Sequence, residues 1–131
     1  MLGIGWVDDI FECVERGMDT FDCVHTTRLA RHGGLYISPA ESGSKKNKYH
    51  IKIKKIKYAS DSKPIDSWCS CPVCKKYSRK DLHKLFKAKN PKYAKLATIH
   101  NISFMEKLLK EIRESIKEGS FQKLKSYWLQ R

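Results

Sequence analysis

Three cysteines stand close together in the sequence, in the pattern Cys69-x-Cys71-x2-Cys74. Thiolates at this spacing can point at one metal ion, and a structural Zn²⁺ site built on three cysteines takes one further ligand, often a histidine. His83 and His100, both downstream, could each close the site. The spacing therefore predicts a structural Cys₃His zinc site, against the alternatives of unrelated free thiols or a disulfide.

A second group of residues that could do chemistry follows the stretch 18–24, which alternates like a strand. Asp22 lies near the C-terminal end of that predicted strand, where parallel α/β folds place reactive side chains. An aspartate that caps a loop is the alternative. Arg28 and Arg31 come directly afterwards, and their planar guanidinium groups are suited to phosphates.

The first segment that must position Asp22 is residues 1–25. Residues 2–5 read as the end of a buried strand, whose glycines allow close approach of a ligand or another backbone. Residues 8–17 have an acidic first turn, an apolar stripe and Gly17 as a stop, so they predict a short helix. Strand, helix and strand in this order predict a βαβ unit and a parallel sheet.

The segment before the cysteines predicts two pairing strands, 35–37 and 49–53, around a flexible loop at 41–47. The alternation of apolar and polar residues shifts by one position after Ile53, which suggests a bulge at residues 54–55. Lysines recur along this segment, where they could face a nucleic-acid backbone or simply solvent; they are Lys52, Lys54, Lys55 and Lys57.

Two helices are predicted after the cysteines. Ser78 and Asp81 form a capping-box pattern that opens a helix ending before Asn90-Pro91, with His83 partly buried on it. Ser103 and Glu106 form a second such pattern, which predicts the start of the longest helix. That helix should end at Gly119, with an apolar stripe that includes Met105, Leu108, Leu109, Ile112 and Ile116, and the aromatic tail 121–128 should dock.

Composition narrows the class of partner. The 131 residues carry a formal net charge of +13, which favours a polyanion, nucleic acid before membrane. Residues 1–25 contribute a net −5 and the remaining chain +18. No run of residues is apolar enough to span a bilayer, and no secretory signal is visible at the start. Five cysteines without such a signal indicate a reducing cytosol, with Cys13 and Cys23 as core thiols.

The motifs taken together resemble a known family. Residues 21–24 (FDCV) are followed by T-R-x-A-R-H-G at 27–33, then by C-x-C-x2-C-x25-H, with His100 followed by Asn101. In this order and spacing they resemble the C-terminal third of the tRNA-guanine transglycosylases (queuine tRNA-ribosyltransferases), over essentially the whole chain. The resemblance implies that His100, which precedes an asparagine as in the family, is the fourth zinc ligand.

The resemblance also implies an activity, the exchange of the wobble guanine of tRNA for a 7-deazaguanine base (queuine or its precursor). Asp22 matches the family's nucleophile, a carboxylate that attacks the ribose C1′ and is later displaced with net retention. Arg28 and Arg31 match arginines that hold the flipped anticodon segment, and Leu2 and Gly3 match positions that contact the base.

The implied fold class is α/β, the C-terminal portion of a TIM-type (β/α)₈ barrel with an inserted zinc-binding subdomain. We expect the last βαβ unit at 1–34, the zinc subdomain at 35–102, and a helix and tail that pack on the barrel at 103–131. A complete barrel needs about 250 residues. We therefore expect this chain to be inactive alone, as a fragment, a truncated relative or half of a split enzyme, with an N-terminal portion or a second copy as partner.

The alternative function is a non-catalytic zinc module that binds RNA or a partner subunit. The basic charge and the cysteine spacing fit it equally well, whereas base exchange depends on Asp22.

Overall fold

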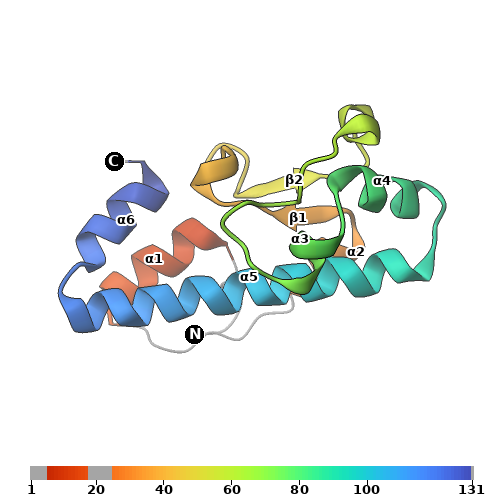
Figure 1. Ribbon diagram of the computed structural model, residues 1–131. Helices are drawn as coiled ribbons and strands as arrows, with labels where there is room; N and C mark the ends of the chain where they lie inside the picture. The colour runs from red at the N-terminus through yellow and green to blue at the C-terminus, as the bar shows by residue number, and fades with distance from the viewer. Residues whose placement is uncertain (1–5, 18–24, 131) are drawn as a thin grey trace.

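The computed structural model describes residues 6–17 and 25–130 of the chain. Its longest element is helix α5 (Pro91–Glu118), along which the other elements are arranged (Figure 1). Short 3₁₀ helices lie at Pro39–Glu41 and Ile56–Ser60. The other elements are α1 (Val7–Glu15), α2 (His25–Arg31), β1 (Gly34–Tyr36), β2 (His50–Lys52), α3 (Pro72–Lys76), α4 (Arg79–Lys87) and α6 (Phe121–Leu129).

Helix α5 begins earlier than the sequence pattern predicts. The Asn90 side chain caps it by accepting a hydrogen bond from the Lys92 amide, and Pro91 occupies the first turn, where its missing N–H costs nothing. The prediction that this helix starts at Ser103 is wrong, because Ser103 lies inside it. The end at Gly119 is confirmed, with a left-handed φ of +75° at that glycine.

The apolar stripe of α5 is confirmed in its central part. Met105, Leu108 and Ile112 are buried, and Leu109 is half-buried. Ile116 is 53% exposed, so its predicted inward orientation is wrong. The stripe thus covers the core only as far as the packed elements extend along the helix.

The predicted strand pair is confirmed as an antiparallel sheet of β1 and β2, with Tyr36 opposite His50 and Gly34 opposite Lys52. The predicted bulge at residues 54–55 is not what breaks the alternation. The chain turns there, as the Lys55 amide donates to the Lys52 carbonyl, and it then enters a 3₁₀ helix that leaves Ile56 82% exposed. Gly33, with φ of +91°, makes the turn from α2 into β1.

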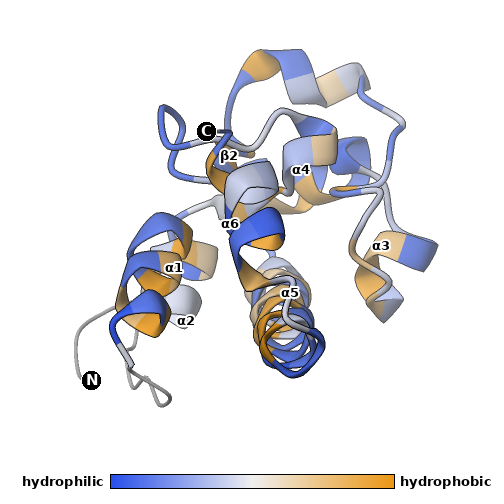
Figure 2. Cartoon of the chain, turned by 90° about the vertical axis from the view of Figure 1, so that its left-hand side faces the viewer, coloured by the Kyte–Doolittle hydropathy of each residue, from blue (hydrophilic) through white to orange (hydrophobic). Residues whose placement is uncertain are grey.

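Helices α1 and α6 lie side by side and cover one end of α5 (Figures 1 and 2). The helix predicted at 8–17 is confirmed as α1, and the predicted docking of the aromatic tail is confirmed by the nearly complete burial of Trp128. Trp128 lies within about 6 Å of several other aromatic rings, those of Phe11, Tyr49, Trp68 and Phe104. Aromatic packing therefore joins the N-terminal helix, the hairpin and the C-terminal helix.

The described residues form a mainly helical unit with one small antiparallel sheet. The strands predicted at 2–5 and 18–24, and with them the parallel sheet, lie outside the described residues. The domain boundaries remain predictions, although helix α5 runs without a break across the boundary proposed at residues 102–103.

Candidate metal centre

Cys69, Cys71, Cys74 and His100 form one buried cluster, and their candidate ligand atoms all lie within 4.8 Å of one another. Cys69 and Cys71 come from the loop before α3, Cys74 from α3, and His100 from the middle of α5. The four cysteines of the described residues, Cys13 included, are free thiols, so the disulfide alternative does not apply to them. Residues far apart in the sequence thus meet at one point.

The spacing of these atoms fits a tetrahedral zinc ion. Nδ1 of His100 lies 3.3 Å from Sγ of Cys74 and 3.5 Å from Sγ of Cys71. Zinc bonded to sulfur at about 2.3 Å and to nitrogen at about 2.0 Å in a tetrahedron places these ligand atoms roughly 3.5 Å apart. Two of the distances within the predicted set of three cysteines and one histidine therefore match those around one zinc ion, and all of the candidate ligand atoms lie within 4.8 Å of one another.

The imidazole of His100 is held in the tautomer that a ligand needs. Its Nε2 lies 2.9 Å from the carbonyl oxygen of Tyr36 in β1, to which it donates. With the proton on Nε2, the lone pair of Nδ1 faces the sulfurs. Metal-binding histidines commonly donate their second ring nitrogen in this way, which fixes the orientation of the ring.

Asn101, next to this ligand, joins helix α5 to the sheet. Its Oδ1 accepts a hydrogen bond from the Tyr36 amide at 3.1 Å, and its Nδ2 donates to the carbonyls of Gly34 and Thr26. The side chain is completely buried. Because Thr26 belongs to α2, this one amide fixes α2, β1 and α5 around His100.

Asp66 braces the cysteine loop, and the sequence motifs did not identify it. It is 1% exposed, and its Oδ1 accepts hydrogen bonds from the amide and the hydroxyl of Ser38. Its Oδ2 accepts from the Cys69 amide at 2.9 Å. The aspartate three residues before Cys69 is a pattern that often forms such a turn, but only the structure reveals its partner Ser38.

The first turn of α3 positions the other two thiols. Cys71 caps this helix, since its Sγ accepts a hydrogen bond from the Cys74 amide at 3.4 Å, and Pro72 occupies the first helical position. The ring of Pro72 fixes its backbone φ and so stiffens the turn between these two cysteines.

Contacts among the four groups shift their proton affinities. Hydrogen bonds with Cys69 and Cys74 lower the pKa of the Cys71 thiol, whereas hydrogen bonds with Cys69 and Cys71 raise the pKa of Cys74. Burial alone would lower the pKa of His100, but its contacts with Cys69 and Cys71 raise it to about 9. These shifts favour a thiolate at Cys71 beside a positive charge, which a metal cation would supply.

His83 is not part of this cluster. It is 7% exposed on α4, and its Nδ1 lies 2.7 Å from the carbonyl oxygen of Ile53. The alternative in which His83 closes the zinc site is therefore wrong, and the prediction that it is a buried polar residue is confirmed.

The other predicted site residues are only partly described. Arg28 and Arg31 are exposed on α2, the helix that Asn101 ties to the metal centre. Asp22, Leu2 and Gly3 lie outside the described residues, as does Cys23. Helix α2 begins at His25, three residues after Asp22 in the sequence.

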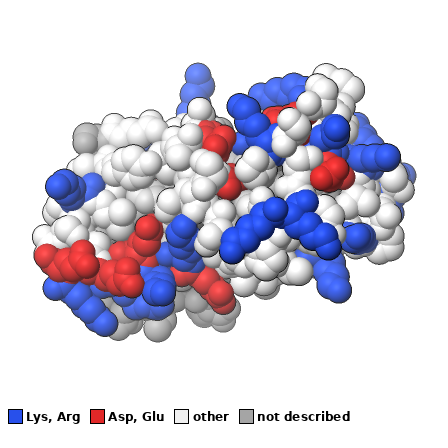
Figure 3. Space-filling model, in the orientation of Figure 1, with Lys and Arg blue, Asp and Glu red and all other residues white. Residues whose placement is uncertain are grey.

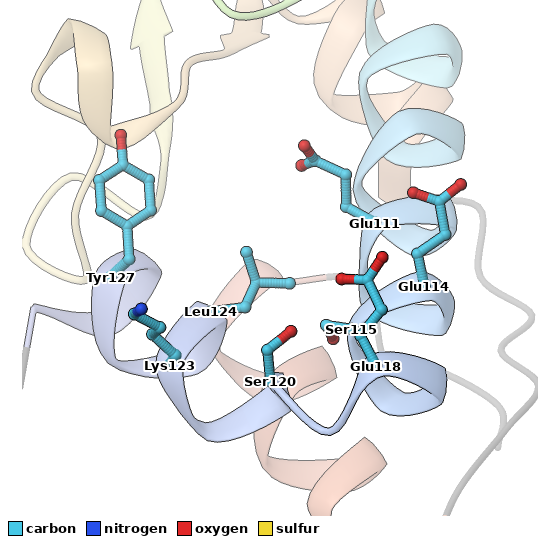
Figure 4. Close-up of a pocket in the computed structure, with 8 residues that line it drawn as sticks. All are labelled: Glu111, Glu114, Ser115, Glu118, Ser120, Lys123, Leu124 and Tyr127. Atoms are coloured by element: carbon cyan, nitrogen blue, oxygen red, sulfur yellow. The ribbon is translucent and has the colours of Figure 1, made fainter.

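On the face shown in Figure 3, most of the acidic side chains gather at one end of the molecule, with basic side chains among them. A groove of about 340 Å³ between α5 and α6 is lined on the α5 side by Glu111, Glu114 and Glu118, with Lys123 and Tyr127 on α6 (Figure 4). None of the metal-centre residues lines it. Basic side chains dominate the other end, around β2 and α4 (Figure 3).

None of the helices in the described part of the chain combines the length and hydrophobicity needed to cross a membrane.

Comparison with known proteins identifies similar sequences over the whole chain. Residues 1–131 match the family model described as queuine tRNA-ribosyltransferase. A putative queuine tRNA-ribosyltransferase from Archaeoglobus fulgidus is 50% identical over 129 residues, 98% of this chain and 32% of that protein. The queuine tRNA-ribosyltransferase of Roseiflexus sp. (strain RS-1) is 43% identical over 98% of this chain and 31% of its own length. The chain spans about a third of the length of the curated relatives it matches.

Proposed function

The chain belongs to the queuine tRNA-ribosyltransferase family, and we propose that it supplies the nucleophile and the zinc-binding part of a tRNA-guanine transglycosylase. The family match over residues 1–131 carries this proposal. The buried Cys₃His cluster agrees with it, because the family resemblance assigns zinc to these same four residues.

The proposed metal is Zn²⁺, held by Cys69, Cys71, Cys74 and His100. Three thiolates and one imidazole are soft to borderline ligands that suit zinc, and four protein ligands leave no open position for a substrate. The ion would therefore stabilise the structure and take no part in the reaction. Its effect is to join the loop before α3 to helix α5, and through His100 to strand β1.

The proposed reaction is an exchange of bases at one ribose of tRNA. The carboxylate of Asp22 attacks C1′, a bond forms between its oxygen and C1′, and guanine leaves with the electrons of the glycosidic bond. The departing nitrogen of guanine takes up a proton. A 7-deazaguanine base then loses the corresponding proton as its nitrogen attacks the same carbon and displaces the carboxylate. Two displacements give net retention, as in other retaining glycosyl transfers.

The other proposed contact residues precede or follow Asp22 in the sequence. Arg28 and Arg31 would hold the backbone of the anticodon segment, which fits their exposure on α2. Leu2 and Gly3 would contact the base. The proposed scaffold is the TIM-type (β/α)₈ barrel of the family, of which this chain contributes the C-terminal part, and the proposed location is the cytoplasm.

A chimera tests this proposal. In the Roseiflexus relative, the matching C-terminal third is replaced by this chain, so that the barrel is complete. We expect the chimera to incorporate labelled guanine into tRNA, and Asp22→Asn to abolish incorporation while tRNA binding persists, because an amide is not an anionic nucleophile.

The matched control in this chimera is Asp9→Asn, which removes one half-buried carboxylate from the first turn of α1. It should retain full exchange. Undiminished exchange by the Asp22→Asn chimera would remove Asp22 from the mechanism. RNA binding without any exchange by the parent chimera would favour the non-catalytic zinc module.

A further inference from the structure

A strongly basic hollow lies beside strand β2, outside the metal centre. Its volume is about 370 Å³, and five lysines line it, Lys46, Lys48, Lys52, Lys55 and Lys57. The other lining residues are Asn47, His50, Ile51 and Tyr58, so none of the described residues that line it is acidic. We call this feature the lysine pocket.

Most of its lysines have no acidic partner. Lys48 lies 3.4 Å from a carboxylate oxygen of Asp8. Within residues 6–17 and 25–130, the other four lysines form no ion pair with a carboxylate. By contrast, buried Lys125 contacts two glutamates, Glu12 and Glu15. The positive charge of the pocket is therefore left available to a ligand.

The concave shape strengthens the attraction for an anion. Like charges around a hollow with low-dielectric walls focus their field into it, and this raises the local concentration of anions. The field is felt by His50 in the wall, whose pKa is lowered first by burial and further by the charge of Lys52. Lysine ammonium groups bind phosphates as point charges, without the fixed geometry that arginine forks impose.

The strand that lines the pocket is joined through the backbone to the end of α2, the helix that carries the arginines proposed to hold tRNA. The Ile53 amide donates to the Gly33 carbonyl at 2.9 Å, which joins the turn after Lys52 to the end of α2. Arg31 lies two residues before Gly33 on that helix. A flexible phosphodiester chain can follow this surface into a hollow, whereas a flat membrane cannot enter one.

We propose that the lysine pocket binds backbone phosphates of the tRNA, outside the anticodon segment held by Arg28 and Arg31. This inference rests on the proposed function for the identity of the RNA. The phosphate chemistry rests on the pocket itself.

The test is the binding of unmodified tRNA to the zinc-loaded 131-residue chain at several salt concentrations. The pocket variant is Lys52/Lys55/Lys57→Gln. The matched control is Lys110/Lys117/Lys123→Gln, which removes the same charge from exposed lysines on α5 and α6. Equal zinc content and equal melting temperature show that both variants are folded.

We expect the pocket variant to bind tRNA at least about tenfold more weakly at ~0.1 M salt. Its slope of log affinity against log salt should fall by about one unit per phosphate-binding lysine. The control should change affinity by less than about twofold, as expected for a small change in net charge. Equal losses in the two variants would overturn the proposal, because they would reflect net charge alone.

A second experiment measures the binding of the chain and of the pocket variant to vesicles that contain phosphatidylserine. If the chain binds them more tightly than tRNA and the pocket variant loses that binding, the pocket serves a membrane and the proposal is wrong. In the chimera, the pocket variant should raise the KM for tRNA and leave kcat unchanged. If the parent chimera exchanges no base while the pocket variant still loses tRNA affinity, only the proposed function fails.

Discussion

His100 shows how a single residue acquires a defined role from its surroundings. One ring nitrogen donates to the Tyr36 carbonyl, and the other faces the sulfurs of Cys71 and Cys74. His83 is also buried, but its ring contacts the Ile53 carbonyl and it lies outside the cluster. Burial of a histidine alone therefore does not distinguish a ligand from a core residue, whereas its partners do.

The first prediction follows from this contrast. Cys74→Ser should abolish stoichiometric zinc binding, because a serine hydroxyl is a poor substitute for a thiolate ligand. His83→Ala should retain one zinc per chain and lose about 1 to 3 kcal/mol of stability, since the buried Ile53 carbonyl is left without its partner. Metal analysis and thermal melting of the two proteins measure both effects. Zinc retained in Cys74→Ser and lost in His83→Ala would reverse the assignment.

At the residue scale, the sequence could predict the members of the buried cluster but not the residues that support them. The cysteine spacing indicated three members, and the histidine followed by an asparagine indicated the fourth through the family resemblance. Asp66 could not be predicted in the same way, because its partner Ser38 lies 28 residues away and only the fold brings them together. A local sequence motif predicts local geometry, but it does not predict a hydrogen bond to a residue far away in the sequence.

Helix α5 is the element that the sequence pattern placed incorrectly. Ser103 and Glu106 have the spacing of a capping box, yet Asn90 and Pro91 provide a stronger start, and the helix continues through His100 and Asn101. A capping pattern inside a helix is neutral when the chain before it is already helical. The correction matters for function, because a helical His100 is held rigidly in register with the apolar stripe that faces the core.

The second prediction tests this start. Asn90→Ala should destabilise the protein by about 1 kcal/mol, because the Lys92 amide loses its side-chain acceptor. Ser103→Ala should change stability by less than about 0.5 kcal/mol, the usual effect at a half-buried position without a cap. Urea denaturation of the zinc-loaded proteins measures both. A larger loss of stability for Ser103→Ala than for Asn90→Ala would instead support a helix that begins at Ser103.

The third prediction concerns the elements that the metal joins. Zinc at the Cys₃His site connects the loop before α3 to α5, and structural zinc contributes folding free energy on the order of 10 kcal/mol apparent. Chelation should therefore abolish amide-exchange protection in residues 69–100 and lower the melting temperature sharply. Protection should persist longest where α1 and α6 pack through Phe11 and Trp128. An unchanged exchange pattern and melting curve after chelation would contradict a structural zinc.

On the scale of the whole molecule, charge is distributed unevenly along α5. Carboxylates gather in the groove between α5 and α6, and lysines gather around β2 (Figure 3). We therefore expect RNA to approach the β2 end, where none of the described residues that line the lysine pocket is acidic, rather than the groove lined by glutamates. Composition predicted the polyanionic partner, but the two ends became distinguishable only in the folded chain, because the lysine pocket is assembled from the loop, the strand and the turn that follows it.

The parallel sheet and the barrel are inferred from the family relationship alone, because the described strands form only an antiparallel pair. A single strand pair does not by itself provide the preorganised site that a nucleophile requires. The activity that we propose for Asp22 would therefore require the completed barrel, and the decisive measurement is made on the chimera that contains it.

That measurement is the capture of a covalent enzyme–tRNA intermediate. The chimera is incubated with tRNA, quenched in denaturant and digested, and the ribose-linked peptide is identified by mass spectrometry. The account predicts an adduct on the peptide that contains Asp22, which disappears in Asp22→Asn and on addition of excess 7-deazaguanine base. Base exchange by the chimera with an adduct on another residue, or with no adduct at all, would contradict the central claim that Asp22 attacks the ribose.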